Sequence, residues 1–270
     1  MANQDIDFSP RRIGALVLRH LYLMRTSWPR LLEMIYWPTV QMVLWGFITL
    51  FLKNNSSYVA QATGVLLSAV LLWDVLFRGQ LGIALVFMEE MWSRNLGHLF
   101  VSPLRPYEMV VSLILMSLIR TMIGIGGAAL VAIPLFHFNI FAMGLPLLGF
   151  FLNLIIMGWA IGLLVAGIVL RYGLGAESVA WIAIFALQPI SAIYYPVAIL
   201  PHWLQPVAWC LPSSHVFEGM RELLFQRTFN TTHLLQAMAL NALYLACGIA
   251  AFLAYFRAAR QRGLLLQIGE

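Results

Sequence analysis

Long uninterrupted apolar stretches constrain this chain more than any other feature. Six of them, each about 20 residues or longer, account for most of the 270 residues. Each is long enough to cross a hydrocarbon core of about 30 Å as a helix. Charged residues make up only 10% of the chain, whereas a soluble domain usually carries roughly 25%. The sequence therefore predicts an all-α integral membrane protein with no separate soluble domain.

The apolar stretches define one transmembrane domain over residues 1–270, with a helix at 9–30 ahead of the first span. The six spans are expected near residues 31–52, 62–88, 109–136, 143–170, 178–200 and 234–256. Ser9 and Pro10 are typical of a helix start. Apolar residues then recur at helical spacing and arginines occupy the other faces. This pattern predicts an interfacial helix with its arginines toward lipid headgroups, although a soluble amphipathic helix is the alternative.

The arginines also predict the orientation of the spans. Basic residues outnumber acidic ones by 16 to 11, and all but one of the basic residues are arginine. Eleven arginines lie in segments on the N-terminal side of the bundle, whereas the opposite segments hold Lys53, Arg221 and Arg227. By the positive-inside rule, both termini are expected to be cytoplasmic. Such an excess indicates anionic membrane lipids as partners, and no nucleic acid.

One long connection, residues 201–233, is expected on the outer side. It is half apolar, so we expect re-entrant or interfacial helices that pack on the outer mouth of the bundle. The candidate residues of this mouth, from the connection and the segment before it, are Tyr194, Tyr195, Trp203, His215, Glu218 and Arg221. The aromatic rings could stack on sugars, but an aromatic belt at headgroup level is the preferred interpretation.

Enzyme motifs are incomplete in this sequence. Residues 212–215 resemble part of a membrane lipid phosphatase motif. Those enzymes also need a lysine followed by an Arg-Pro pair, but the one lysine of the chain, Lys53, lies far upstream of Arg105-Pro106 and on the opposite side of the membrane. Asp74 is the one carboxylate deep within a span, so an intramembrane aspartate dyad cannot form. His215, Glu218 and Glu222 share a helical face, but a polar helix surface explains them better than a metal ion. We therefore predict no catalytic residue and no metal site.

Three charged residues lie inside the predicted spans. Asp74 and Arg78 are four residues apart on one helix, which permits a direct ion pair, and Arg120 lies at similar depth on the next span. A charge at the bilayer centre costs at least about 2.5–3.5 kcal/mol, so each should face protein or water and have a partner. Two interpretations stay open: polar points on a translocation path, or a buried ion pair that joins helices, which is somewhat favoured.

Small residues form a stripe on the fourth span. Gly158 and Gly162 are one helical turn apart, and Ala166 follows one turn later. The pattern predicts a close helix contact, either within one chain or between two chains.

The loop after the second span carries the most informative motif. Residues 89–106 read EEMWSRNLGHLFVSPLRP. They resemble the loop before the third span in bacterial ABC exporter permeases of the type-2 family, which includes drug, nodulation-factor and polysaccharide exporters. Residues 194–206 resemble the outer hydrophobic-Pro-x-Trp passage of that family, and residues 215–221 resemble its stretch before the last span. With six spans and an N-terminal helix, the resemblance covers nearly the whole chain.

The resemblance implies that this loop is a coupling helix for a separate cytoplasmic ATPase. Leu96, Leu99 and Phe100 would sit in a groove of the ATPase, with lipid as the alternative partner. The polar residues assigned to the same contact are Glu89, Glu90, Arg94 and His98. The chain has no nucleotide-binding G-x-x-x-x-G-K-[S/T] loop. ATP and Mg²⁺ would therefore be bound by the partner, and no cofactor by this chain.

The resemblance further implies the permease subunit of an ATP-driven exporter in the bacterial cytoplasmic membrane. Two ATPase copies and a second permease copy would complete it, with a homodimer expected in preference to a heterodimer. The expected substrate is amphiphilic, drug-like or lipid-linked, with a glycan as one option, and it would move outward. Two other classes stay open: an ATP-independent channel or secondary transporter, and a membrane assembly protein. A neighbouring ATPase gene would separate these classes.

Overall fold

The computed structural model describes residues 8–55 and 59–261, and the regular elements in these ranges are all helical. The α-helices are α1 (Pro10–Arg25), α2 (Trp28–Asn55), α3 (Val59–Trp92), α4 (Leu96–Val101), α5 (Pro106–Phe136), α6 (Leu145–Tyr172), α7 (Ser178–Ile190), α8 (Gln205–Trp209), α9 (Pro212–Gln226) and α10 (Thr231–Gln261). Three short 3₁₀ helices, η1 (Ile140–Met143), η2 (Leu174–Ala176) and η3 (Val197–Ile199), lie in the connections. The predicted all-α membrane fold is confirmed.

Within the described ranges, five helices are long and apolar enough to cross a membrane: α2, α3, α5, α6 and α10. The expected fifth span, 178–200, differs. Its helix α7 ends at Ile190 after 13 residues, about 20 Å long against a hydrocarbon core of about 30 Å. Ala192 then adopts a left-handed backbone (φ 51°). Pro196, which lacks a backbone N–H, begins the turn into η3. The segment is therefore a shorter apolar helix followed by a folded connection.

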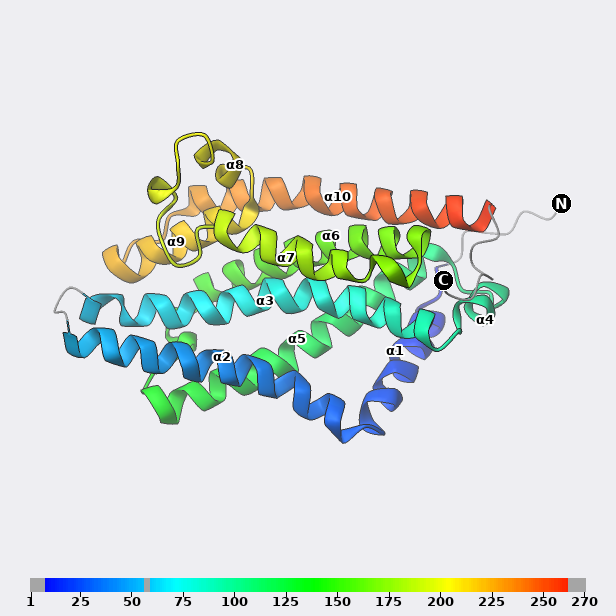
Figure 1. The fold of residues 1–270 in the computed structure, drawn as a ribbon, viewed down its shortest axis with the longest axis horizontal. Coiled ribbons are helices and arrows are strands. Elements are labelled where there is room, and N and C mark those ends of the chain that lie inside the picture. The colour runs from blue at the N-terminus through cyan, green and yellow to red at the C-terminus, as the bar shows by residue number, and fades with distance from the viewer. Residues whose placement is uncertain (1–7, 56–58, 262–270) are drawn as a thin grey trace.

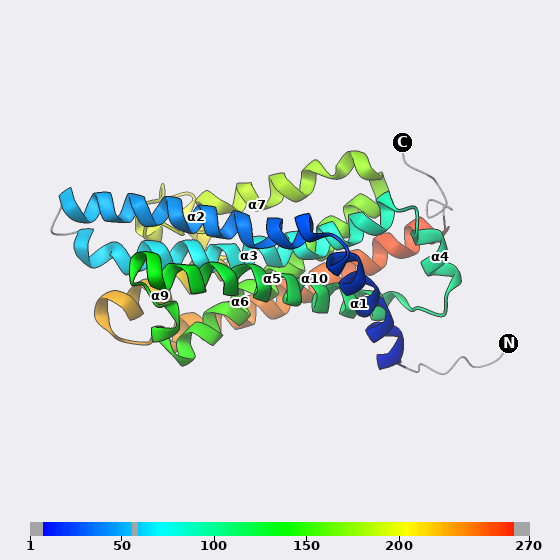
Figure 2. The same ribbon diagram turned by 90° about the horizontal axis from the view of Figure 1, so that it is seen from below.

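The long helices lie side by side along the longest axis of the molecule (Figure 1). At one end, α10 finishes, α1 slants across the bundle and α4 projects beyond it; we call this the α4 end. At the opposite end, α8 and α9 precede α10; we call this the α9 end. Figure 2 shows α1 crossing the bundle at a steep angle to α2, with a short turn between the two helices.

Close packing of α6 on α3 forms the centre of the bundle. A Cβ atom at Gly158 would lie 2.7 Å from the carbonyl oxygen of Leu76, and one at Gly162 would lie 2.7 Å from that of Gln80. Side chains at these positions would push the two backbones apart. The small-residue stripe therefore makes its contact within the chain.

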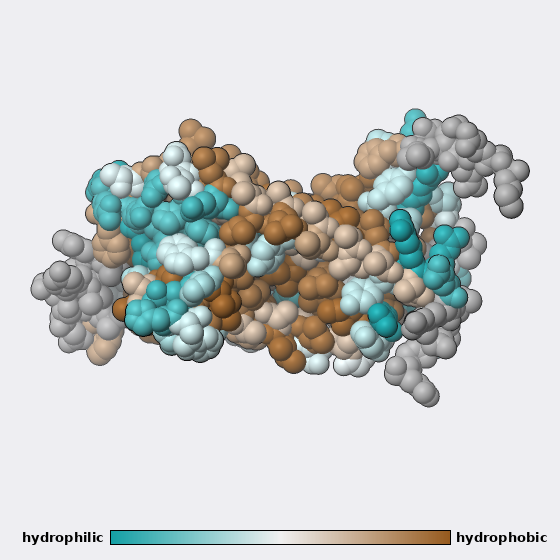
Figure 3. Space-filling view, turned by 90° about the horizontal axis from the view of Figure 1, so that it is seen from above, coloured by the Kyte–Doolittle hydropathy of each residue, from teal (hydrophilic) through white to brown (hydrophobic). Residues whose placement is uncertain are grey.

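A hydrophobic belt separates two polar ends on the face shown in Figure 3. Large apolar side chains stay exposed along α2, α7 and α10, as membrane-facing helices require. The most exposed of them include Phe47 on α2, Ile182 on α7 and Leu243 on α10.

Candidate functional site

The candidate site is the α4 end, where the chain turns from α3 into α4 and on to α5. Arg94 adopts a left-handed backbone (φ 54°), and the N–H of Asn95 donates to the carbonyl oxygen of Glu90. Pro106 begins α5. Its missing N–H costs nothing there, because the first N–H groups of a helix have no acceptor within the helix. The ends of two long helices thus fix the position of α4.

Glu90, in the last turn of α3, is fully buried, accepts hydrogen bonds from two side chains and lies next to a third. Arg19 of α1 donates through Nη1 to both carboxylate oxygens, at 2.8 and 2.9 Å. Asn95, next to α4, donates through Nδ2 at 2.7 Å. His20 of α1 places Nε2 3.2 Å from Oε1. One carboxylate therefore joins α1, α3 and the start of α4.

His20 is buried beside this carboxylate. Burial holds the pKa of His20 below its ordinary value, although the nearby Glu90 carboxylate acts in the opposite direction. The imidazole is therefore neutral at neutral pH. It fills space between α1 and α3 and adds no charge there.

Glu89 links α3 to α5. Both of its carboxylate oxygens accept from Nη2 of Arg120 at 3.0 Å. Arg120 itself lies on α5 between Ser117, whose hydroxyl donates to the carbonyl oxygen of Gly79, and Gly124, which packs against Arg78. It therefore lies near the depth of Arg78, where the sequence placed it, and its guanidinium extends from there to Glu89 at the α4 end.

Glu108, in the first turn of α5, is the third carboxylate of this end and is fully buried. Arg12 of α1 donates to it from Nη2 at 2.6 Å and from Nε at 2.9 Å. The backbone N–H groups of Ser9 and Arg105 also donate to it, at 2.9 and 3.0 Å. The first turns of α1 and α5 are thereby joined. We call Glu89, Glu90, Glu108 and their arginine partners the carboxylate network.

Sequence reasoning missed Glu108 and the two α1 arginines of this network, Arg12 and Arg19, whereas it singled out Arg120. The signal for Glu108 was present, because a glutamate two positions after the proline that starts a helix completes a capping box. The arginines of α1 were expected to face headgroups. Instead Arg12 and Arg19 turn toward the bundle, whereas Arg11 and Arg25 stay exposed.

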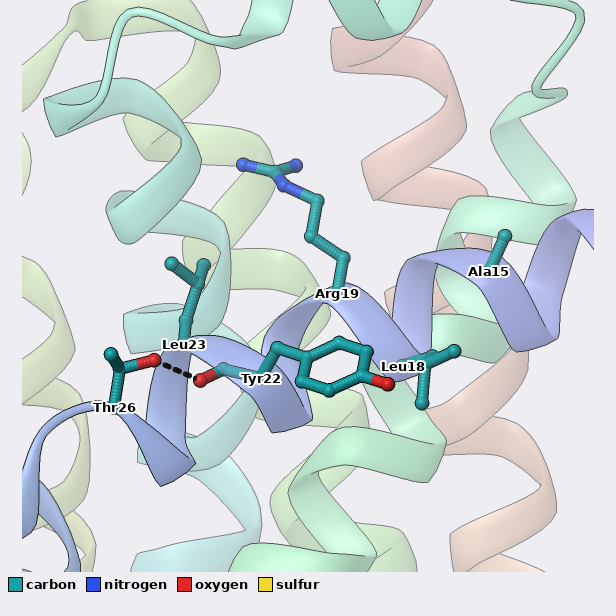
Figure 4. Close-up of a pocket in the computed structure, with 6 residues that line it drawn as sticks. All are labelled: Ala15, Leu18, Arg19, Tyr22, Leu23 and Thr26. Atoms are coloured by element: carbon teal, nitrogen blue, oxygen red, sulfur yellow. Dashed lines mark hydrogen bonds between the residues drawn. The ribbon is translucent and has the colours of Figure 1, made fainter.

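Between the exposed Arg11 and Arg25, the outer face of α1 is mostly apolar as a result. A shallow groove there is lined by Ala15, Leu18, Arg19, Tyr22, Leu23 and Thr26. Figure 4 shows the Arg19 guanidinium extending away from the Tyr22 and Leu18 side chains. Tyr22 is 58% and Leu18 50% exposed. This face suits the membrane interface, where an aromatic ring and aliphatic chains meet headgroups.

The residues assigned to ATPase contact fall into two groups. Leu96 is buried, in the same apolar cluster as Met109, and Leu99 packs against it. Arg94 and His98 are exposed, as is Trp92 at the end of α3, which the sequence analysis did not assign. The side chain of Phe100 lies outside the described residues. The polar surface of the loop, and not Leu96, is thus open to a partner.

Asp74 and Arg78 lie in the middle of α3, away from the carboxylate network. In the described part of the chain, no ion pair joins them, although their spacing permits one. Oδ2 of Asp74 and Nε of Arg78 are buried without a hydrogen-bond partner there. The Arg78 guanidinium instead packs against Gly124 of α5, where an added Cβ would lie 3.1 Å from Nη1.

The α9 end is held by side chains that bind backbone groups. Glu218 of α9 accepts from the N–H of Val197 at 2.6 Å. Arg221 donates to the carbonyl oxygen of Ile193 at 3.2 Å and to Glu218 at 3.1 Å. We call Glu218 and Arg221 the α9 clamp, because they fix the chain that follows α7. Tyr194, next in that chain, stacks on Trp45 of α2 at 4.5 Å.

The other outer residues are separate from the clamp. Tyr195 donates from its hydroxyl to the carbonyl oxygen of Pro189, and Trp203 is 74% exposed. His215 faces the carbonyl oxygen of Trp209 and not Glu218. Among the described residues, no group of three or more His, Cys, Asp and Glu side chains could hold a metal ion. His215, Glu218 and Glu222 therefore do not form one.

The architecture defines a multi-pass helical membrane protein with a short, partly exposed helix that projects from one end. The sequence model of one family, the ABC-2 type transporters, matches residues 11–225. The chain belongs to this family and is a transmembrane permease component of an ABC transporter. Such permeases are generally non-catalytic and work with an ABC ATPase. A comparison with curated proteins gives no match.

Proposed function

We propose that this chain is the membrane subunit of an ATP-driven exporter in a bacterial cytoplasmic membrane, with the α4 end in the cytoplasm. The positive-inside rule supports this orientation. Several exposed arginines lie at the α4 end of the bundle, on α1 or near the helix termini that meet there: Arg11, Arg25, Arg30, Arg94, Arg171, Arg257 and Arg260. The exposed arginine at the α9 end is Arg227, within the described residues.

The carboxylate network is the observation that best supports coupling through α4. A partner that pushes on α4 acts on the end of α3, where Glu89 and Glu90 lie. Glu90 passes a displacement to α1 through Arg19, and Glu89 passes it to α5 through Arg120. Separating the two charges of a largely buried pair is costly, so the helices that carry them should move together. A movement of α4 would therefore shift three helices together.

The same proposal gives the subunit composition of the transporter. Two ATPase copies would bind ATP and Mg²⁺, and this chain would need no cofactor. A second permease copy, in preference to a different sister chain, would cover part of the exposed apolar surface of α2 and α7. Trp37 and Phe47 on α2 and Phe185 on α7 are each more than half exposed.

The proposed substrate is amphiphilic, drug-like or lipid-linked, including lipid-linked glycans, and it moves outward. The unpartnered polar atoms of Asp74 and Arg78 support the interpretation as points on the path over that as an internal tie. The outward direction follows from the resemblance to exporters.

The decisive experiment is co-purification of this chain with an ABC ATPase from the cells that produce it. Charge reversal of the exposed loop, in the double variant Arg94→Glu with His98→Glu, should lower ATPase recovery at least tenfold. The matched control is Arg227→Glu, an exposed arginine at the opposite end, which should leave recovery unchanged. Full recovery with the double variant would show that α4 is not the docking point. Failure to recover any ATPase with the unmodified chain would refute the ATP-driven proposal itself.

A further inference from the structure

Two histidines at the α9 end form a pair that neither the carboxylate network nor the α9 clamp uses. His215 lies on α9 and His233 in the first turn of α10, and their Nδ1 atoms are 3.3 Å apart. Both rings pack against Trp209, whose indole stacks on His233 at 5.8 Å with an interplanar angle of 10°. The pair lines an open groove of about 610 Å³, so water and protons can reach it.

The neighbour of His215 determines which of the two rings donates. Nε2 of His215 is 2.9 Å from the carbonyl oxygen of Trp209. A carbonyl oxygen only accepts, so this Nε2 carries the hydrogen, and Nδ1 of the neutral ring is left as an acceptor. The Nδ1–H of His233 therefore donates to Nδ1 of His215. One N–H···N hydrogen bond thus joins α9 to α10.

A first added proton has a place that leaves this bond intact. With its hydrogen on Nδ1, neutral His233 keeps a lone pair on Nε2, which lies 3.6 Å from Oε1 of Glu222. This distance is too long for a hydrogen bond but short enough for an ion pair once the ring is charged. A proton on this Nε2 would place the positive charge beside the carboxylate. His233 would still donate from Nδ1 to His215.

A second proton has one place to go, and it ends the bond. Nε2 of His215 already holds a hydrogen, so a proton on His215 must add at Nδ1, the acceptor of the bond. Two N–H groups on two positive rings would then face each other across 3.3 Å. Burial lowers the pKa of His215 below its ordinary value of about 6.5, and His233 also lowers it, although the Trp209 carbonyl oxygen acts in the opposite direction.

The other groups around the pair leave this outcome to the two rings and their carboxylate. The helix α6 contributes the apolar ring of Phe150 near His233, and α10 contributes the amide of Gln236. Other ionisable side chains of α9 and α10 bind elsewhere. Glu218 and Arg221 bind each other and backbone groups, and Tyr244 donates its hydroxyl to a carbonyl oxygen.

We propose that His215 and His233 form an acid-sensitive latch between α9 and α10, which stays closed while at most one ring is charged and opens when both are. The α9 clamp uses neither histidine, so it stays intact when the latch opens, and α9 carries the clamped connection with it. In the proposed orientation the α9 end faces the outside, so the latch responds to external pH. Its chemistry does not depend on ATP-driven transport.

The protonation order is tested on the full-length protein in detergent, labelled with ¹⁵N at histidine. At pH 7.5, nuclear magnetic resonance should show hydrogen on Nε2 of His215 and on Nδ1 of His233. On acidification, His233 should gain a proton on Nε2 before His215 gains one on Nδ1. The matched control, His202→Gln, removes an exposed histidine of the same end and should leave both titrations unchanged. Hydrogen on Nδ1 of His215 at pH 7.5 would reverse donor and acceptor and overturn the latch.

Hydrogen exchange, corrected for the intrinsic effect of pH, tests whether the latch opens. Between pH 7.5 and 5.0, protection of residues 209–215 and 231–236 should fall at least about fivefold in the wild type. Residues 193–197, held by the α9 clamp, should keep their protection. His215→Gln and His233→Gln should each abolish the pH response, because two charged rings can no longer form. Unchanged protection in the wild type, or a full response in either variant, would contradict the proposal.

Glu222→Gln keeps both rings and so tests the latch without removing it. The amide cannot offset the charge on His233, so both proton uptakes and the loss of protection should move to lower pH, while the N–H···N bond persists at pH 7.5. Size-exclusion profiles at pH 7.5 confirm that each variant is folded. Titrations that match the wild type would show that Glu222 does not hold the first proton, and the proposed order of protonation would be wrong.

Discussion

The two ends of this bundle are held together by different kinds of contact. At the α4 end, the carboxylate network joins whole helices: each of its carboxylates meets an arginine from another long helix or from α1. At the α9 end, the α9 clamp binds backbone groups of one short connection. The first arrangement links separate elements, and the second fixes the shape of a single segment.

This difference predicts different responses to force and to mutation. A charge pair between helices passes a displacement from one helix to the next, because neither charge can be left buried alone. A side chain that binds backbone groups keeps its local segment folded but carries little load between helices. The α4 end is therefore suited to receive a movement, and the α9 end is suited to keep a fixed outer shape.

Close packing of α6 on α3 joins the two ends of the bundle, and Gly158→Val would break that contact. The new side chain would start 2.7 Å from the Leu76 carbonyl oxygen and 2.9 Å from the Gln80 nitrogen. Backbone atoms cannot move aside, so α6 must separate from α3. We expect a loss of about 3 kcal/mol, at the upper end of overpacking costs. Thermal unfolding of the purified protein measures it.

Gly126→Val is the matched control, because a Cβ at Gly126 meets no atom within 4 Å. It should change stability by less than about 0.5 kcal/mol, as surface substitutions usually do. Equal losses in the two variants would mean that α3 and α6 are not in close contact.

Glu108→Ala tests the strongest pair of the carboxylate network. It leaves Arg12, the arginine of α1, without its carboxylate and frees the N–H groups of Ser9 and Arg105. Breaking a buried pair costs about 3–5 kcal/mol, but Arg12 is 28% exposed, so we expect about 2–3 kcal/mol. Denaturant or thermal unfolding checks this. Arg11→Ala, on the exposed side of α1, should cost almost nothing.

Glu90→Gln tests whether the network transmits as well as stabilises. The amide keeps the shape but loses the charge that Arg19 binds, so we expect a loss of about 2 kcal/mol. ATPase co-purification should persist, while substrate-stimulated ATP hydrolysis should fall. Glu177→Gln, a half-buried carboxylate just before α7, serves as the control. Normal stimulation in a folded Glu90→Gln protein would contradict transmission through this residue.

Arg221→Ala sharpens the contrast from the other end. It removes the bonds to Ile193 and Glu218, for an expected cost of about 1–2 kcal/mol. Hydrogen exchange should speed up in residues 193–197 and stay unchanged in α1 and α4. ATPase recovery should equal that of the wild type. Faster exchange at the α4 end would show that the ends are not distinct.

Periodicity and length were enough to predict the spans that became α2, α3, α5, α6 and α10. They were not enough for α7, because an apolar composition does not reveal a turn at Ala192. The amphipathic pattern predicted α1 but not the direction of its arginines. Arg12 and Glu108 are 96 residues apart, and their meeting depends on how α1 crosses the bundle. Long-range pairing of this kind leaves no local signal.

Spacing also gave three site residues the wrong surroundings. Asp74 and Arg78 have the separation of an ion pair, but the Arg78 side chain turns toward α5. Leu96 has the position of an exposed coupling residue, but the tight turn at Arg94 folds it against the bundle. In both cases tertiary packing, which the sequence does not show, decides between two local options.

The smallest expected effect is the pH dependence that His20 gives the α4 end. Burial lowers its pKa, while Glu90 and Glu89 raise it and Arg19 and Arg120 lower it. Below its ordinary pKa of about 6.5, the unfolded chain therefore takes up a proton that the folded chain does not. Stability from His20 is fully present above that pH and falls as the pH drops, by about 1 kcal/mol at most between pH 6.5 and 5.5.

Unfolding of the wild type and of His20→Gln at pH 7.5, 6.5 and 5.5 measures this contribution. The variant should lose less stability on acidification than the wild type, because it cannot be protonated. His98→Gln removes an exposed histidine of α4 and should follow the wild-type curve. Parallel curves for the wild type and His20→Gln would mean that protonated His20 is accommodated beside the glutamates. In that case the α4 end would tolerate a charge as readily as an exposed surface, and its rigidity would have to come from apolar packing instead.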